Sequence, residues 1–512
     1  MAQVFTWMGR GWCIASIGLI LAIGLGALPA PVLAQEAATE AAPAETAEAA
    51  PAEEAAAEEP AAEEAPEETP APTLEDVAAG VDAAKLSGNN AWMLTSSALV
   101  LFMTVPGLAM FYGGLVRRKN VLSVLMQCIF LMGLMTVIWA LYGYSLAFGG
   151  DGAESPYIGN GQYLLMNEVS RTWDTETNTV VEPMEGAIPR LTHMVFQGMF
   201  FIITPALICG AFAERMKFSA MVLFSILWGT FIYCPLCHWV WDGGILAFNG
   251  AHSWSGGALD FAGGTVVHIS SGVSALICAI LLGRRKGIGT EDMRPHNLTY
   301  TAIGAGMLWV GWFGFNAGSE LASDHLTSSA FVVTHFGAAA GVLGWAAYEW
   351  LTRGKPSVLG AASGAVAGLV CVTPAAGFVS PMAGLILGVA AGMICAYAVT
   401  LKSKFGYDDA LDAFGVHGVG GTLGAILTGV FATREHWDIN GSKQLGWVDT
   451  GDFGSSVMMG QITATAVTWA FSIVGTFVVL MVVKAITGLR IDEEGEYKGL
   501  DLADHEEEGY LF

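Results

Sequence analysis

The chain has 512 residues, of which 54% are hydrophobic and only 13% are charged. A soluble protein of this length needs far more charge to cover its surface, so this composition excludes a soluble globular protein. Apolar runs of about 20 residues recur between Trp92 and Lys484, and each is long enough to cross a bilayer core of roughly 30 Å as a helix. The composition therefore predicts an all-α polytopic membrane protein.

The N-terminal segment resembles a secretory signal peptide. Residues 1–34 combine Arg10, an apolar run over 11–28 and the small-residue sequence at 32–34, which is the pattern of a cleaved signal. An uncleaved first span is the alternative. One of the eight cysteines, Cys13, lies in this segment, and six of the others lie in apolar runs, so we expect no disulfide framework.

Much of the formal net charge of −24 is concentrated in the next segment. Residues 35–87 are rich in alanine, glutamate and proline, and no aromatic residue occurs between Gln35 and Pro72. A segment of this composition cannot bury enough apolar surface to offset the entropy lost on ordering. We therefore expect residues 35–87 to form a disordered acidic extension.

Eleven transmembrane helices are predicted within a transmembrane domain at residues 88–488, followed by a tail at 489–512. Their ranges are 92–116, 121–148, 191–213, 217–240, 261–282, 298–318, 328–351, 358–376, 380–401, 412–432 and 455–486. Every odd-numbered span from the first to the ninth is followed by a short basic loop, such as Arg117-Arg118-Lys119, whereas the loops after spans two and four are acidic or almost uncharged. Basic loops stay in the cytoplasm, so we expect the N-terminus outside and the C-terminus in the cytoplasm.

Two related segments indicate an internal repeat. Asp260 to His268 lies in the fifth span, and Asp412 to His417 lies in the tenth. Since each block holds five helices, an odd number, the second block is inverted relative to the first, and such repeats place their site near the bilayer midplane. The sequence therefore predicts a five-plus-five inverted repeat with an extra C-terminal helix.

The two histidines of this repeat are the leading candidates for chemistry, because ionisable groups inside a membrane are costly. His268 lies about 12 Å deep if the span is helical, and His417 lies near the inner end of its span. A neutral imidazole offers one donor and one acceptor and titrates near cellular pH, so a pair can relay a proton through an apolar pore. Two unrelated core histidines are the alternative. His335 has no repeat partner, and we expect it to be a packed core residue.

Aromatic residues and one hydroxyl gather at the predicted outer mouth. The group comprises Phe196, Phe200, Trp241 and Ser319, with Phe315 one turn deeper. Aromatic faces attract a cation that has shed water, and a serine oxygen accepts a hydrogen bond. Taken singly, each aromatic residue is more typical of a core or an interface belt than of a cation site, so the interpretation depends on all five lying on the same side. Asp260 begins the fifth span near this mouth, where we favour a helix cap over a cation-attracting role.

Several longer motifs resemble the ammonium transporter family, the bacterial-type Amt branch of the Amt/Mep/Rh superfamily. They are Phe-Tyr-Gly-Gly at 111–114, Arg-Lys-Asn at 118–120, Ala-Glu-Arg at 213–215, Asp-Phe-Ala-Gly-Gly-Thr-Val-Val-His at 260–268, Gly-Trp-Phe-Gly-Phe-Asn-Ala-Gly-Ser at 311–319, Gly-Ala-Val-Ala-Gly-Leu-Val at 364–370 and Phe-Gly-Val-His-Gly at 414–418. The resemblance covers residues 88–505. The acidic extension and an insert near 170–187 depart from the family pattern.

The resemblance implies ammonium uptake across the plasma (inner) membrane, with methylammonium as an analogue. It implies a homotrimer in membrane lipid, with a recruitment site at Phe196, Phe200, Trp241 and Ser319, a gate at Phe200 and Phe315, and a proton relay at His268 and His417. It also implies supporting roles for Asp260 and for Thr373, the latter near the inner pore. The ammonium ion is deprotonated, and ammonia and a proton pass separately. A PII-type signalling protein is the implied cytoplasmic partner, and no enzyme activity, cofactor, metal or nucleic acid is implied.

Two alternatives remain. Cys234-Pro-Leu-Cys237-His238 matches the pattern for covalent haem attachment, which would suggest a periplasmic redox protein. The acidic tail from Arg490 to Phe512 is compatible with an ammonium sensor that transports little. No phosphate-binding loop of the form G-x-x-x-x-G-K-[ST] occurs, so we do not expect coupling to ATP within this chain.

Overall fold

The structure is a computed structural model. It describes residues 72–511 except 151, 153 and 438–444, so the expected signal peptide and most of the acidic extension lie outside the described residues. The chain divides into two compact units, residues 1–79 and 80–512. All the helices below belong to the second unit, apart from the first residues of α2.

The first half of the fold runs from α2 to α9. Its helices are α2 (Leu74–Phe102), α3 (Ala109–Leu115), α4 (Val121–Ile138), α5 (Tyr144–Phe148), α6 (Arg190–Phe212), α7 (Phe218–Trp228), α8 (Cys234–Trp241) and α9 (Ser270–Leu282). Short tighter or wider turns join several of them, namely η1 (Met103–Leu108), η2 (Arg118–Asn120), η3 (Trp139–Gly143), η4 (Leu164–Met166), η5 (Gly229–Tyr233), η6 (Trp254–Gly256) and η7 (Gly264–Ile269).

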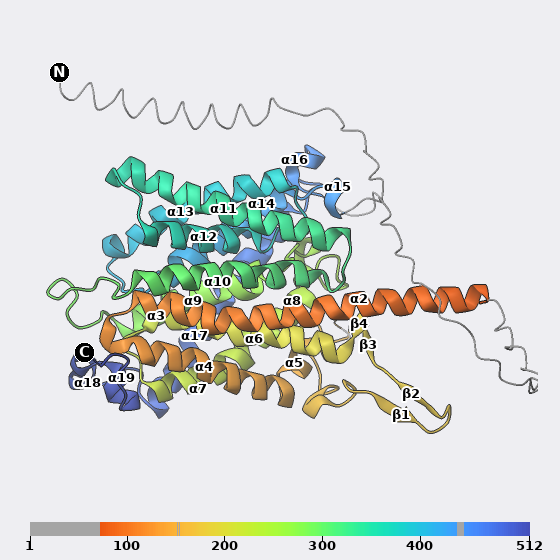
Figure 1. Cartoon of the computed structure of the whole chain (residues 1–512), viewed down its shortest axis with the longest axis horizontal. Helices are drawn as coiled ribbons and strands as arrows, with labels where there is room; N and C mark the ends of the chain where they lie inside the picture. The colour runs from red at the N-terminus through yellow and green to blue at the C-terminus, as the bar shows by residue number, and fades with distance from the viewer. Residues whose placement is uncertain (1–71, 151, 153, 438–444, 512) are drawn as a thin grey trace, which may run out of the picture. The chain divides into compact units, whose positions relative to one another are not determined.

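The second half runs from α10 to the C-terminus. It comprises α10 (Leu298–Ala317), η8 (Gly318–Glu320), α11 (His325–Arg353), α12 (Val358–Val372), α13 (Pro381–Phe405), η9 (Phe414–Gly418), α14 (Val419–Phe431), α15 (Arg434–Trp437), α16 (Trp447–Thr450) and α17 (Met458–Ile486). Two short helices, α18 (Glu493–Lys498) and α19 (Leu500–His505), form the tail. The long helices lie side by side and roughly parallel (Figure 1).

Eleven helical segments match the eleven predicted spans. Nine of them, among the described residues, are long and apolar enough to cross a membrane. The other two are α10, with 20 residues, and α12, with only 15. The fold is therefore the predicted eleven-helix polytopic bundle, built as a five-plus-five inverted repeat in which α17 is the extra helix.

The first span begins earlier than expected. Helix α2 starts at Leu74, so residues 74–87 are helical and do not belong to a disordered extension. Two signals explain this start. Thr73 and Asp76 exchange reciprocal hydrogen bonds as a capping box, with Thr73 N 2.8 Å from Asp76 Oδ2 and Asp76 N 3.1 Å from Thr73 Oγ1. The alanine-rich sequence that follows also favours a helix.

Small residues allow three helices to pack closely. A side chain on Gly341 of α11 would collide with the backbone of α12 at Gly364, and one on Gly392 of α13 would collide with the backbone at Gly341. In lipid, helices associate through such small-residue faces. These glycines thus allow the three helices to pack closely.

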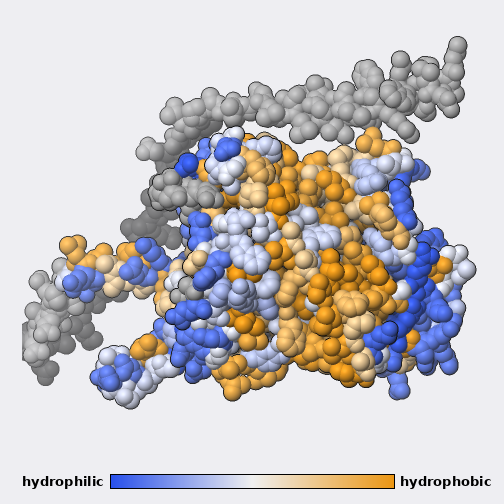
Figure 2. Space-filling view, turned by 180° about the vertical axis from the view of Figure 1, so that it is seen from behind, coloured by the Kyte–Doolittle hydropathy of each residue, from blue (hydrophilic) through white to orange (hydrophobic). Residues whose placement is uncertain are grey.

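The surface of the bundle is apolar in its middle. Hydrophobic side chains form a broad band, with the most hydrophilic residues gathered towards the end that carries the C-terminal tail (Figure 2). Leu343, Val474 and Phe231 on this surface are 68%, 62% and 60% exposed. An apolar area of this extent suits a lipid environment.

Two small hairpins precede α6. Strands β1 (Thr172–Asp174) and β2 (Thr179–Val181) pair antiparallel, as do β3 (Met184–Glu185) and β4 (Ile188–Pro189). They form the insert that departs from the family pattern, and β4 leads directly into α6, which carries part of the site.

Candidate functional site

The structure brings the two repeat histidines together. His268 lies on η7 and His417 on η9, 149 residues apart, and their Nδ1 atoms are 3.3 Å from each other. The ring centroids are 5.3 Å apart with an interplanar angle of 27°. The two residues are only 1% and 3% exposed, so they form a buried polar pair inside an apolar bundle.

A buried aspartate begins each histidine segment. Asp260 Oδ1 accepts from Gly263 N at 2.9 Å, and its Oδ2 accepts from Thr265 N at 2.8 Å. Asp260 thus accepts hydrogen bonds from N–H groups at the start of η7 and acts as the helix cap that we expected. Its repeat counterpart is Asp409, whose carboxylate accepts from the backbone N–H groups of residues 413 and 414 at 3.1 and 2.8 Å.

Pairing Asp412 with Asp260 was therefore wrong. Asp260 and Asp409 each lie eight residues before their histidine, which identifies them as equivalent. Asp412 instead accepts a hydrogen bond from Lys402 Nζ at 2.5 Å. The shared aspartate–histidine spacing of eight residues was the available signal, because a match of Asp412 to Asp260 needs a gap of three residues.

Thr373 lies against the histidine pair. It follows the C-terminus of α12, and its Oγ1 is 3.3 Å from His268 Nε2 and 2.9 Å from Trp312 Nε1. Thr373 thus contacts the histidine nearer to the predicted outer gate, and its supporting role stays a prediction. The early end of α12 places the hydroxyl at this depth.

Three cavities lie along a path through the bundle. The first, of about 180 Å³, is lined by Trp241 and Ser319 among others. The second, of about 10 Å³, is lined by His268, His417 and Phe315, with otherwise mainly apolar side chains. That volume is at the lower limit for a single water molecule. The third, of about 580 Å³, also reaches His417 and opens among charged residues.

Aromatic rings separate the first cavity from the second. The centroids of Phe200 and Phe315 are 4.2 Å apart, and both residues are 1% exposed. Phe200 meets Trp241 edge to face at 5.9 Å. Phe196 packs against Phe200 at 5.1 Å but does not line the first cavity, so it supports the ring from behind.

Two polar groups of the first cavity have defined hydrogen bonds. Ser319 Oγ donates to the Phe315 carbonyl oxygen at 2.8 Å. Trp241 Nε1 donates to the Asp260 carbonyl oxygen at 2.9 Å. The hydroxyl proton of Ser319 is thus used in the bond to Phe315, so its Oγ can only accept a hydrogen bond from a ligand.

Four polar residues of the first cavity were not predicted from the sequence, namely Glu185, His193, Gln197 and Asp242. His193 Nδ1 is 3.0 Å from the Tyr144 hydroxyl, and its Nε2 is 3.4 Å from Gln197 Nε2. Gln197 directly follows Phe196 on an otherwise apolar helix, which was an available signal. Glu185 comes from the insert, and nothing in the sequence indicated that it reaches the cavity.

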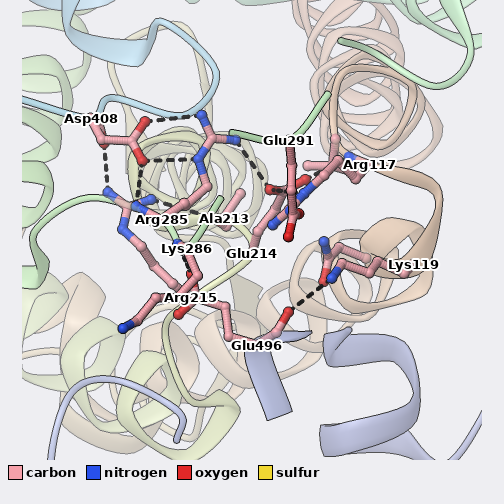
Figure 3. A network of polar contacts seen from close by, with 12 residues as sticks. Arg117, Lys119, Ala213, Glu214, Arg215, Arg285, Lys286, Glu291, Asp408 and Glu496 are labelled. Carbon is pink, nitrogen blue, oxygen red and sulfur yellow. Dashed lines mark hydrogen bonds and ion pairs between the residues drawn. The ribbon is translucent and has the colours of Figure 1, made fainter. Parts of the chain in front are cut away.

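An ion-pair network adjoins the third cavity, which is lined by two of its members, Arg285 and Asp408 (Figure 3). Glu214 pairs with Arg117 at 2.9 Å and with Arg285 at 3.2 Å, and Arg285 also pairs with Asp408 at 2.9 Å. Burial by itself raises the pKa of Asp408, but the hydrogen bonds from Arg285 outweigh it and hold the pKa below its usual value. Asp408 therefore remains charged at neutral pH.

The C-terminal tail joins this network. Glu496 is 1% exposed and pairs with Arg490 at 2.6 Å, while its Oε1 accepts from Lys286 N at 2.5 Å. Asp501 accepts from Ser123 N at 2.8 Å, in the first turn of α4. The acidic tail is therefore held against the bundle by specific contacts.

The haem pattern has a packing role. Cys234 and Cys237 are fully buried in α8, and the ring nitrogens of His238 lie 3.1 Å from the Ala147 carbonyl oxygen and 2.5 Å from that of Ser155. Thioether bonds need thiols that a porphyrin can reach, so this geometry argues against the redox alternative.

His335, which we expected in the core, is exposed on α11 and contacts aromatic rings such as Trp309.

Comparisons with known proteins agree with this geometry. Residues 91–510 match the model of the Ammonium Transporter Family. An ammonium transporter of Bacillus subtilis is 46% identical over 426 residues, covering 83% of this chain and 98% of that protein. One of Mycobacterium tuberculosis is also 46% identical, over 440 residues, covering 83% of this chain and 90% of that protein.

A solved structure of Candida albicans Mep2 shares the fold. It superposes with a TM-score of 0.71 at 32% identity and covers 83% of this chain and 93% of that chain. The family match over residues 91–510 includes both histidine segments and most of the tail. The chain is therefore a multi-pass membrane protein that belongs to the Ammonium Transporter Family.

Proposed function

We propose that the protein takes up ammonium across the plasma (inner) membrane by separating the ion into ammonia and a proton at the His268–His417 pair. The single observation that carries this mechanism is the buried hydrogen bond between the two rings, which lies between an aromatic gate and an inner cavity. The basic loops support an N-terminus outside and a C-terminus in the cytoplasm.

Recruitment takes place in the first cavity. Ammonium has only donors, and Ser319 Oγ is held as an acceptor there. The face of Trp241, which lines the cavity and packs against the gate residue Phe200, adds cation–π attraction to an ion that has lost water. The carboxylates of Glu185 and Asp242 line the same cavity and favour a cation over a neutral amine.

Passage requires the gate rings to move apart. The central cavity beyond Phe200 and Phe315 is narrow and mainly apolar, so a charged ion pays a large desolvation cost there. Neutral ammonia does not pay this cost. The histidine pair takes the proton, ammonia crosses the narrow section, and both reach the wide inner cavity, where water restores the ion.

Assembly and regulation follow from the family resemblance. We propose a homotrimer, with one pathway in each protomer, and a PII-type signalling protein that docks at the cytoplasmic face. Native mass spectrometry of the purified protein gives the oligomeric state. The sensor alternative is not favoured, because relatives that are 46% identical to this chain are named ammonium transporters.

Uptake of labelled methylammonium into proteoliposomes tests the mechanism. We expect wild-type uptake well above that of empty liposomes, and loss of most of it in His268→Ala and His417→Ala. His335→Ala is the matched control, because this histidine is exposed and lies outside the pathway. Wild-type rates in both pathway variants would contradict the proposal.

A further inference from the structure

The side chain of Gln461 makes three hydrogen bonds inside the bundle. Gln461 lies in the first turn of α17, the helix outside the repeat, and is only 1% exposed. Its Oε1 accepts from Leu259 N at 2.6 Å. Its Nε2 donates to the Leu259 carbonyl oxygen at 3.0 Å and to the Ala425 carbonyl oxygen at 2.7 Å. A side-chain amide has two N–H donors, so both donors of Gln461 are used.

These partners fix the orientation of the amide. A backbone N–H only donates and a carbonyl oxygen only accepts. Turning the amide over would place its NH2 group against the N–H of Leu259 and its oxygen against two carbonyl oxygens. Leu259 and Gln461 are both buried, so water cannot offset such contacts. The amide therefore has one favourable orientation, and we call this three-bond contact the Gln461 clasp.

The Gln461 clasp joins the extra helix to both halves of the repeat. Leu259 directly precedes Asp260, which caps η7, the segment that carries His268. Ala425 lies on α14, which continues from η9, the segment that carries His417. One side chain of α17 thus holds the two spans on which the histidines lie.

A glycine leaves room for the clasp. Gly429 lies one turn after Ala425 on α14, and a Cβ atom there would lie 2.9 Å from Gln461 Cγ and 2.7 Å from Met458 Sδ. Both distances are shorter than ordinary van der Waals contacts between such atoms. An alanine at this position would therefore push the Gln461 side chain away from its partners.

The backbone held by the clasp also holds the indole of Trp241. Gln461 binds both the N–H and the carbonyl oxygen of Leu259, and the next carbonyl oxygen, that of Asp260, accepts from Trp241 Nε1 at 2.9 Å. Trp241 lines the first cavity, whereas Gln461 is not among the residues that line it. Any influence of Gln461 on that cavity thus passes through the backbone of residues 259 and 260.

We infer that Gln461 is a positioning residue for the recruitment of ammonium. Its clasp on Leu259 keeps the Asp260 carbonyl oxygen in place, and this oxygen keeps the face of Trp241 turned to the first cavity. The helix outside the repeat therefore takes part in recruitment, although none of its residues lines the cavity. This inference rests on the proposed function and adds a residue that acts on its first step.

Kinetics of methylammonium uptake into proteoliposomes test the role of Gln461. Gln461→Leu keeps a side chain of similar size but removes all three hydrogen bonds. We expect the KM to rise about tenfold, as for one lost buried hydrogen bond. The maximal rate should stay within about twofold of the wild type, because the clasp touches neither the gate rings nor the histidine pair and its loss weakens only binding.

Two further variants accompany this measurement. Gly429→Ala displaces the clasp without changing Gln461, so its KM should rise in the same direction. Thr468→Val is the matched control, because Thr468 is a fully buried residue of the same helix, about two turns beyond Gln461. We expect its KM to equal that of the wild type. A tenfold rise in this control would show that any change in the core of α17 has the effect, and would overturn the specific role of Gln461.

Fluorine-19 spectra of protein labelled with 5-fluorotryptophan report on the indole directly. The Trp241 signal is assigned from its loss in Trp241→Phe. We expect a single Trp241 signal in the wild type and a shifted or split signal in Gln461→Leu and Gly429→Ala. A residue that only stabilised the fold would lower the melting temperature and leave both this signal and the KM unchanged.

The outcomes separate this inference from the proposed function. A wild-type KM and a wild-type Trp241 signal in folded Gln461→Leu would overturn the positioning role and leave the transport mechanism intact. If Gln461→Leu does not fold, the same two results in Gly429→Ala overturn it. Absence of uptake by the wild-type protein would refute the proposed function, whereas the Trp241 signal would still show whether Gln461 positions the indole.

Discussion

The two aspartate caps predict a measurable asymmetry in stability. Asp260→Ala removes the acceptor of at least three backbone N–H groups, those of residues 263, 264 and 265. Asp409→Ala removes the acceptor of two. Each buried N–H left without a partner costs about 1–3 kcal/mol. Because neighbouring bonds are not additive, we expect about 3–6 kcal/mol for Asp260→Ala and about 2–4 kcal/mol for Asp409→Ala.

Thermal unfolding of the purified protein in detergent, followed by tryptophan fluorescence, measures the difference. Asp452→Ala is the control, since Asp452 accepts from Gly454 N and Ser455 N in an exposed loop where water can replace it. We expect that variant to unfold within a degree or two of the wild type, in line with a surface substitution of about 0.5 kcal/mol or less. An Asp260→Ala variant as stable as Asp452→Ala, or less affected than Asp409→Ala, would refute the cap argument.

Three further predictions concern the gate, pH and the tail. Phe315→Ala opens the ring contact at 4.2 Å and should raise leakage of other small cations into liposomes, measured with labelled potassium analogues; unchanged leakage would contradict a gate. Burial raises the pKa of Asp409 to about 6, so between about pH 4 and 6 the folded protein binds a proton that the unfolded chain lacks. Stability from this group therefore falls as pH rises through that window, and melting curves of Asp409→Asn should lose that slope. Glu496→Gln weakens the buried pair with Arg490 and should speed proteolytic removal of the tail; a wild-type cleavage rate would show that other contacts hold it.

The architecture could be predicted well because each membrane span is a long apolar run that is recognisable by itself. Long apolar runs fixed the positions of the helices, and the basic loops gave a consistent orientation. The start of α2 was missed because the acidic, alanine-rich segment at 74–87 has the same composition as the extension before it. The local signal for a helix start was the capping box that Thr73 and Asp76 form.

The candidate site was only partly predictable. The histidines were found because intramembrane ionisable residues are rare and these two recur in related segments. The depth of Thr373 depends on where α12 ends, and helix ends are the least certain feature of any sequence-based prediction. Glu185 reaches the outer cavity through the pairing of β3 with β4, a tertiary arrangement that no local pattern encodes.

The charge moved for each methylammonium molecule is the most direct test of the central claim. Current and labelled uptake are recorded on the same proteoliposomes at a fixed potential. If the ion separates and both parts cross, the wild type should move one charge per amine. His268→Asn and His417→Asn should lose their current even if some neutral amine still passes. Full current at one charge per amine in both variants would show that the ion crosses without help from the histidine pair.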